Sequence, residues 1–281
     1  MSDIPIPRET LSFLEVKRVG DADWVAHLED FFGEAQPGDL LARIVLAASA
    51  LAEGQPLHAL QTIFVEPLTP AIPLSLRVAR LGASDRLVSC EVGRAGAPLL
   101  CVAHAGFGVE ADGLGYQEAK LPSGLPDPES LPTTLEYARR EGWPEAYARG
   151  PLEFRRVGPL RAESGDGSAH VIWLRPRQQP PAAGALEAAV LAFASAFYPH
   201  WEFERRIGAR FDHARFRLLR HALFVARPLR FDDWWLLRGQ SQLAAGGRAL
   251  ARRELFTRDG RLIAAATLEA ATHAQASPKM P

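Results

Sequence analysis

Three side chains have the residue types and positions that suit acid–base chemistry at a carbonyl group. His58 lies in an apolar segment, and a histidine can accept a proton near neutral pH. Asp39 begins an apolar stretch of helical periodicity, where a carboxylate can act as a base or cap the helix. Ser195 ends a second such stretch and could donate a hydrogen bond to a carbonyl oxygen. Each also has a structural interpretation: a core or surface histidine, a helix cap and a packed hydroxyl.

The motifs of several other reaction classes are missing from the sequence. No two histidines have metal-ligand spacing such as His-Glu-x-x-His, so neither a metal nor a cofactor is expected. There is no Gly-x-Ser-x-Gly elbow, phosphate-binding loop or dinucleotide fingerprint. These absences argue against common serine hydrolases, nucleotide hydrolases and Rossmann dehydrogenases.

Composition excludes further classes of protein. The 281 residues include 32 Lys plus Arg and 33 Asp plus Glu, a net charge of −1 that argues against nucleic-acid binding. The longest uncharged and mainly apolar stretch, 188–201, is too short to span a membrane. Residues 1–13 do not resemble a signal peptide, so we expect a cytoplasmic protein. Two cysteines, Cys90 and Cys101, are too few for a disulfide scaffold and are expected to be reduced and buried.

The elements that must position the candidate residues follow two periodicities. Apolar side chains recur at helical spacing over 38–52 and 185–197, which predicts two buried helices. A short helix is also predicted over 133–140. Period-two alternation or short apolar runs predict strands over 74–79, 87–92, 99–105, 221–226, 234–242, 249–256 and 262–269, with a hairpin turn at 93–97.

The second half of the chain repeats the first. Phe64-Val65-Glu66-Pro67-Leu68 corresponds to 224–229, and Arg86 and Gly96 correspond to Arg248 and Gly260 at a nearly constant offset. A sheet that curls around one apolar helix buries it, and two such units can join edge to edge. The sequence therefore predicts an α+β double hotdog. Its expected parts are an N-terminal hotdog over 1–110, a Pro- and Gly-rich linker over 111–150, a C-terminal hotdog over 151–273 and a flexible tail over 274–281.

Five segments resemble motifs of one family, the acyl-CoA thioesterase II family of double hotdogs. They are the helix 37–48, the strand 57–67 with its His58, the strand 221–228 with its His-x-x-x-x-x-Arg-Pro pattern, the acidic-Trp-Leu-Leu segment 232–237 and the final hairpin 254–264. The resemblance runs from about Leu11 to Thr272.

This resemblance implies hydrolysis of an acyl thioester of CoA or an acyl carrier protein by an activated water, and association into a homo-oligomer. The family's Asp, Thr and Gln align with Ala196, Leu218 and Leu268 here. These three residues, with Thr267 beside the last, are expected to line the substrate pocket. The catalytic residues must then be non-standard, with His58, Asp39 and Ser195 as the candidates.

Two alternatives remain open from the sequence. The loss of all three polar side chains favours a non-catalytic protein that binds an acyl group or a partner, since apolar replacements still make a good acyl pocket. The same scaffold could also carry a different biosynthetic reaction.

Overall fold

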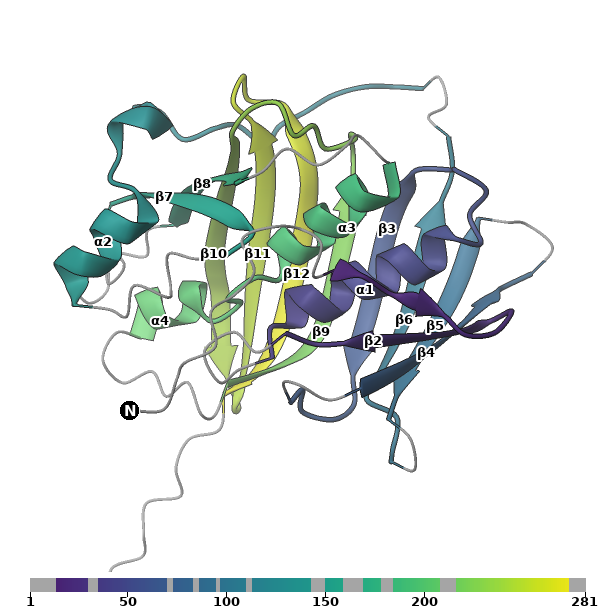
Figure 1. The fold of residues 1–281 in the computed structure, drawn as a ribbon. Coiled ribbons are helices and arrows are strands. Elements are labelled where there is room, and N and C mark those ends of the chain that lie inside the picture. Colours follow the sequence, from purple (N-terminus) through teal and green to yellow (C-terminus); the bar gives the residue numbers. More distant parts are fainter. Residues whose placement is uncertain are drawn as a thin grey trace, which may run out of the picture.

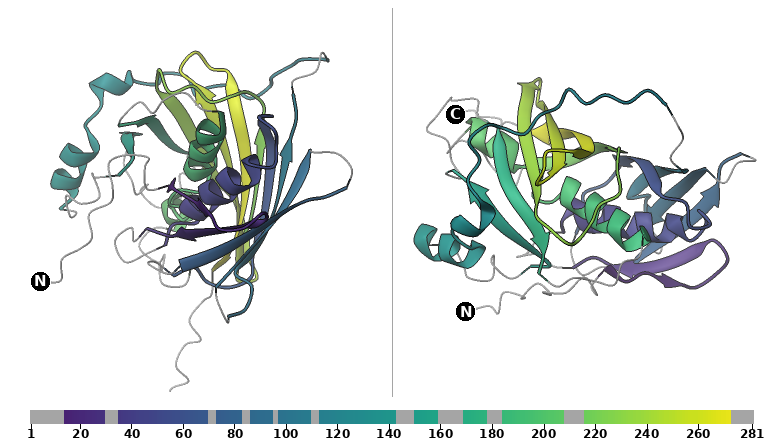
Figure 2. Two further views of the ribbon diagram at one scale, coloured as in Figure 1. Left: turned by 45° about the vertical axis from the view of Figure 1, so that its right-hand side comes forward. Right: turned by 90° about the horizontal axis from the view of Figure 1, so that it is seen from above.

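The structure, a computed structural model, describes residues 14–29, 35–69, 73–82, 86–94, 97–109, 113–142, 150–158, 169–177, 184–207 and 216–272. The described strands form one 12-stranded sheet that curves around two central helices (Figures 1 and 2). This arrangement confirms the predicted double hotdog. The predicted tail 274–281 and the middle of the predicted turn 93–97 lie outside the described residues.

The elements are as follows. The helices are α1 (Pro37–Ser49), the 3-10 helix η2 (Pro128–Ser130), α2 (Thr134–Glu141), α3 (Gly184–Ser195) and α4 (Trp201–Ile207). The strands are β1 (Lys17–Arg18), β2 (Asp23–His27), β3 (Leu57–Phe64), β4 (Pro73–Arg80), β5 (Leu87–Gly93), β6 (Cys101–Phe107), β7 (Leu152–Val157), β8 (His170–Pro176), β9 (Phe216–Val225), β10 (Trp235–Ala245), β11 (Arg248–Thr257) and β12 (Leu262–Thr272).

The sheet is built from two halves of mirrored order. The sequence of neighbours is β1-β2-β4-β5-β6-β3-β9-β12-β11-β10-β8-β7, so the first and second halves meet at β3 and β9. These two strands pair antiparallel, with Thr62 directly opposite His221. The edge-to-edge junction predicted from the repeat is therefore present, and it places one strand of each half at the centre of the molecule.

The two central helices are buried because their residues are apolar on most sides. Leu40, Leu41, Ile44 and Val45 of α1 have no solvent exposure, and α3 is equally apolar. Both helices lie on the concave face of the sheet and pack against each other (Figure 2). Apolar burial of this extent is the main source of stability in such a core.

The segment predicted as a linker contains regular structure. Helix α2 is present as predicted, and Thr133 and Glu136 form a capping box at its start. Gly142 ends α2 with a φ of 71°, a left-handed conformation that glycine adopts without strain. The strands β1, β2, β7 and β8 and the helix α4 were not predicted. The predicted domain boundaries stay a prediction.

The two cysteines are free and buried. They are not directly opposite each other, because Val92 pairs with Cys101 and Cys90 pairs with Ala103. Burial raises the pKa of Cys90 to about 12 and raises the pKa of Cys101 as well. Both are therefore thiols rather than thiolates at neutral pH.

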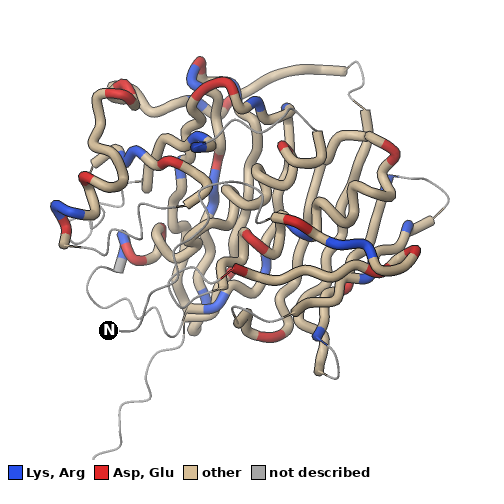
Figure 3. Tube along the Cα trace, in the orientation of Figure 1, with Lys and Arg blue, Asp and Glu red and all other residues tan. Residues whose placement is uncertain are grey.

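Positive and negative residues are interspersed along the described chain (Figure 3). This distribution agrees with the near-zero net charge of the sequence. Within the described residues, no helix is both long enough and apolar enough to cross a lipid bilayer.

Candidate functional site

The start of α1 meets the end of α3 at very short range. A Cβ added to Gly38 would lie 2.3 Å from the carbonyl oxygen of Phe193, so only glycine allows this approach of the two backbones. The Gln36 side chain adds a second link, since its Oε1 accepts a hydrogen bond from the backbone N–H of Tyr198 at 3.2 Å. The end of α3 is thus fixed against the other half of the molecule.

A buried serine–histidine pair lies at this junction. Ser195, the last residue of α3, donates its hydroxyl hydrogen to the carbonyl of Ala192 at 2.8 Å. Its Oγ also lies 3.1 Å from Nε2 of His221 on β9. With its one hydrogen directed at Ala192, the hydroxyl can only accept from His221, an assignment in which Nε2 carries the proton and Nδ1 has a free lone pair. Ser195 and His221 are 0% and 1% exposed.

His221 is a neutral imidazole in this environment. Burial and, to a smaller extent, the nearby positive charge of Arg253 lower its pKa to about 3, and a hydrogen bond with the backbone of Ser195 acts in the opposite direction. Its Nδ1 is buried and has no hydrogen-bond partner. A ligand that donates a hydrogen bond could therefore bind at Nδ1.

Thr62 supplies a second unpartnered polar atom beside the first. It lies directly opposite His221 in the β3–β9 pairing, and directly opposed side chains point to the same face of a sheet. Thr62 is 2% exposed, and its Oγ1 has no hydrogen-bond partner. Buried polar atoms are nearly always satisfied, so two unsatisfied ones on neighbouring strands indicate a place for a water or a substrate group. We call Thr62, Ser195 and His221 the junction cluster.

A buried ion pair supports the end of α3 behind this cluster. Arg253 donates from Nε and Nη2 to the two carboxylate oxygens of Glu202, at 2.7 and 2.9 Å. It also donates to the carbonyl oxygens of Ser195, Phe197 and Tyr198. Carbonyls at a helix C-terminus lack intrahelical partners, and a cation there is favourable. Arg253 therefore fixes the backbone that carries Ser195.

Two of the three positions that align with the family's polar triad adjoin the junction cluster. Ala196 follows Ser195 directly, and Leu268 lies opposite His221 on the other side of β9. Leu218 lies near the start of β9. All three are buried, with exposures of 0%, 0% and 4% in that order. Their burial is established, while their role as the lining of a substrate pocket stays a prediction.

Asp39 is in the first turn of α1 but is not its N-cap, which is Gln36. Its Oδ1 accepts from Nε of Arg43 at 2.9 Å and its Oδ2 accepts from the backbone N–H of Glu29 at 2.8 Å. Burial raises the pKa of Asp39 to about 6, against the opposing effect of Arg43. Both oxygens of this candidate base are engaged, so the structure corrects the helix-cap interpretation and assigns Asp39 a structural ion pair.

Two other candidates lie away from the junction cluster. His58 is exposed on β3, with its ring near Gly108. Thr267 is exposed on β12, and its neighbour Glu269 pairs with the exposed Arg220 and Arg248. The structure therefore does not bring His58, Asp39 and Ser195 into one site, and Thr267 does not line the interior.

Sequence reasoning missed His221 and Thr62 as site residues. Both lie on strands that were singled out for their motifs, and Thr62 shares the inward period-two positions of Leu60 and Phe64. That periodicity could have placed Thr62 inside. As for metals, no cluster of His, Cys, Asp or Glu in the described ranges could hold an ion.

Comparisons with known proteins agree with this fold. A family model described as acyl-CoA thioesterase C-terminal domain matches residues 124–271, slightly more than half of the chain. Acyl-CoA thioesterase 2 of Haemophilus influenzae is 23% identical, over 94% of this chain and 96% of that protein.

Solved structures match over nearly the whole chain. A tesB protein of Mycobacterium avium subsp. paratuberculosis has a TM-score of 0.77 at 22% identity, covering 94% of this chain and 98% of that one. An acyl-CoA thioesterase II of Mycobacterium marinum has a TM-score of 0.73 at 21% identity, covering 96% and 98%. A hot dog fold protein of Alicyclobacillus acidocaldarius has a TM-score of 0.74 at 18% identity, covering 94% and 97%.

Proposed function

Since this chain belongs to the acyl-CoA thioesterase II family, we propose that it binds an acyl-CoA and hydrolyses the thioester at the junction cluster. The observation that carries the proposal is the pair of unpartnered polar atoms, Oγ1 of Thr62 and Nδ1 of His221, on adjacent strands. Two of the three positions where the family's own polar residues are replaced by apolar ones, Ala196 and Leu268, adjoin Ser195 and His221.

The proposed reaction assigns one role to each side chain. Nδ1 of His221 accepts a hydrogen bond from a water, and Oγ1 of Thr62 donates to the carbonyl oxygen of the thioester. The water adds to the carbonyl carbon while its proton moves to Nδ1. The C–S bond then breaks, and the proton passes to the departing thiolate. The products are a carboxylic acid, which releases its proton to solvent at neutral pH, and a free thiol.

Ser195 is a positioning residue in this scheme. Its hydroxyl hydrogen is directed at the carbonyl of Ala192, so it is not poised to lose that hydrogen to His221. It accepts from Nε2 of His221 instead and thereby fixes the tautomer whose free lone pair lies on Nδ1. Fixing the tautomer of a catalytic histidine is the role that a carboxylate has in the serine hydrolases.

The low pKa of His221 sets an expectation for the rate. An imidazole with a pKa near 3 is a weak base, and loss of solvation is the main cause of that value. A water hydrogen-bonded to Nδ1 restores part of the solvation and raises the basicity. We therefore expect slow hydrolysis rather than the rate of an enzyme whose base is matched to neutral pH.

The test is release of free thiol from acyl-CoAs of increasing chain length, with saturable binding measured on the same panel. Release well above background supports hydrolysis. A carrier-protein thioester replaces CoA if acyl-CoAs neither bind nor react.

Size-exclusion chromatography with light scattering tests the homo-oligomer that we also propose, and fractionation tests the proposed cytoplasmic location.

A second function is supported by a different observation. The apolar Ala196, Leu218 and Leu268 are fully accommodated in the core, which favours a protein that binds an acyl thioester without hydrolysing it. Binding without thiol release by the wild-type protein would support this function. A gain of thiol release by the triple variant A196D/L218T/L268Q would then indicate that a correctly placed water was all that the pocket lacked.

A further inference from the structure

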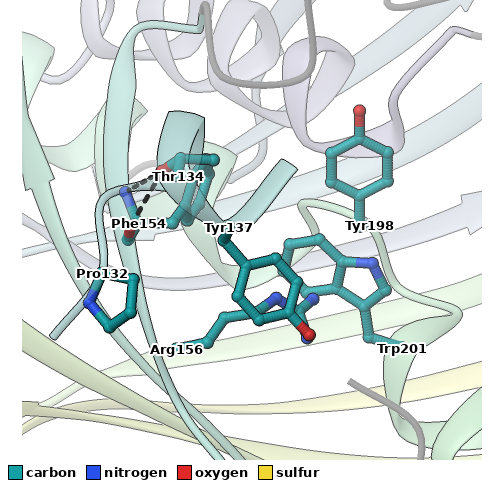
Figure 4. A pocket seen from close by; sticks show the side chains of 7 residues that line it. All are labelled: Pro132, Thr134, Tyr137, Phe154, Arg156, Tyr198 and Trp201. Carbon is teal, nitrogen blue, oxygen red and sulfur yellow. Dashed lines mark hydrogen bonds between the residues drawn. The ribbon is translucent and has the colours of Figure 1, made fainter. Parts of the chain in front are cut away.

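A small pocket in the C-terminal half lies between α2, β7 and α4. No residue of the junction cluster lines it. Its walls include Tyr137 of α2, Phe154 and Arg156 of β7 and Trp201 at the start of α4 (Figure 4). Its volume is about 40 Å³. A buried water needs about 10–15 Å³ on the same measure, so the pocket accommodates a few waters or one small polar group.

Arg156 is the charged group of this pocket. Its guanidinium lies 4.6 Å from the ring centre of Trp201 and 5.6 Å from that of Tyr137, beside both rings (Figure 4). The side chain is part-buried, yet Nη1 and Nη2 are both covered from solvent and neither has a hydrogen-bond partner. Two buried guanidinium nitrogens without acceptors are costly, and contact with aromatic faces compensates only a part of that cost.

The charges around Arg156 do not satisfy these donors. Burial lowers the pKa of Arg156 to about 10, so the side chain stays protonated at neutral pH. Glu204 and Glu141 act on it through space, and Arg205 opposes them. His170, whose ring lies 5.0 Å from that of Trp201, is neutral because burial and Arg156 hold its pKa well below its usual range.

The Thr134 hydroxyl at the edge of the pocket already has two hydrogen-bond partners. Oγ1 of Thr134 donates to the carbonyl of Phe154 at 2.8 Å and accepts from its backbone N–H at 3.2 Å. This pair of bonds fixes α2 against β7 and holds the pocket's shape. Thr134 therefore positions the wall. The two Nη groups of Arg156 have no partner, and a ligand reaches them only if the covering Tyr137 and Trp201 rings shift, since neither nitrogen is exposed to the empty pocket.

We propose that this pocket binds a small carboxylate, paired through its two oxygens with Nη1 and Nη2 of Arg156. The planar guanidinium matches a carboxylate in this two-point geometry. The small volume and aromatic walls favour it over a phosphate, whose further oxygens would be buried without donors.

We distinguish two sources of this carboxylate. One is a free carboxylate such as acetate. The other is the far end of an acyl chain, which would have to part the apolar contacts among Phe154, Trp201 and Ala194, where the structure has no room for a water. The second source rests on the proposed function, and the first does not.

The test measures binding rather than activity. The full-length protein is titrated with acetate and propionate by calorimetry at constant ionic strength, with chloride and phosphate as comparison anions. We expect saturable carboxylate binding that is at least tenfold weaker in R156Q and intermediate in R156K, which keeps the charge but not the fork. R252Q, which changes an exposed arginine on β11, is the matched control and is expected to bind as the wild type does.

Each outcome decides the proposal. Absence of carboxylate binding by the wild type, or equal binding by folded R156Q, overturns it. Glutaryl-CoA and pentanoyl-CoA then distinguish the source, since they differ in the terminal carboxylate. An Arg156-dependent preference of at least tenfold for glutaryl-CoA identifies the acyl chain, and equal affinity identifies a free carboxylate. If acetate binds but no acyl-CoA releases its thiol, the proposed hydrolysis is contradicted and the proposed carboxylate site is not.

Discussion

Thr62 and His221 lie directly opposite each other where the two halves of the sheet join, and each buries a polar atom without a protein partner. Every other feature of the proposed site is arranged around this pair. Ser195 fixes the histidine from the end of α3, and Arg253 fixes the end of α3. The junction of the two halves is therefore both the centre of the fold and the proposed centre of the chemistry.

Replacing Thr62 by valine separates function from stability. The two side chains have the same shape, and the hydroxyl that is lost has no partner, so we expect unchanged or slightly higher stability. If Oγ1 donates to the thioester oxygen, kcat falls by a factor on the order of 100. Thermal unfolding and thiol release on the same preparation measure both quantities. An unchanged kcat would show that Thr62 has no part in the reaction.

The buried His221 makes stability depend on pH. Its pKa is about 3 in the folded protein and 6.5 in the unfolded chain, so the unfolded state binds more protons between these values. The free energy of unfolding should therefore decrease as pH falls below 6.5, by up to about 1.4 kcal/mol per pH unit. The variant H221Q should lose this part of the slope, and the part due to His170 should persist.

Urea unfolding at several pH values measures this dependence. H104Q, which changes an exposed histidine on β6, is the matched control and should keep the wild-type slope. Equal slopes in H221Q and H104Q would mean that His221 is not held neutral in the folded state.

Gly38 should tolerate no side chain. The Cβ of G38A would lie 2.3 Å from the carbonyl oxygen of Phe193, a backbone atom that cannot move alone. Overpacking of this kind costs about 1–3 kcal/mol. G184A, at the open start of α3, places its Cβ in empty space and should be neutral or slightly stabilising. Chemical unfolding compares the two, and equal stability would refute the close approach of α1 and α3.

The Arg253–Glu202 pair should be the most sensitive polar contact. Removing one partner of a buried ion pair leaves the other charge uncompensated, so R253M should lose about 3–5 kcal/mol of stability. R252M changes the next residue, which points to solvent on the same strand, and should lose less than about 1 kcal/mol. A loss of stability in R253M as small as that in R252M would show that the Arg253–Glu202 pair does not stabilise the end of α3.

Most of the fold could be predicted from patterns of residues close in sequence. The apolar periodicity of α1 and α3 and the alternation of β4, β5, β9, β11 and β12 are determined by residues close in sequence, and the structure contains all of these elements. Strand β7 escaped prediction because three of its six residues are charged, which hides a period-two pattern. The guanidinium of its Arg156 lies against Tyr137 of α2 and Trp201 of α4, which are distant in sequence.

The candidate site could not be predicted from patterns of residues close in sequence. Thr62 and His221 become neighbours through the register of β3 on β9, and a shift of one residue would turn either side chain to the opposite face. Asp39 shows the converse. Its type and helical position suggested a base or a cap, yet its role is set by Arg43 and the backbone of Glu29.

The most direct test of the account is kcat/KM for thiol release by H221Q, compared with H104Q, on the best acyl-CoA. The account predicts that H221Q falls by at least a factor of about 100 while H104Q matches the wild type, since it assigns the base to Nδ1 of His221, a buried atom without a partner. Equal kcat/KM for the two folded variants would contradict hydrolysis at the junction cluster.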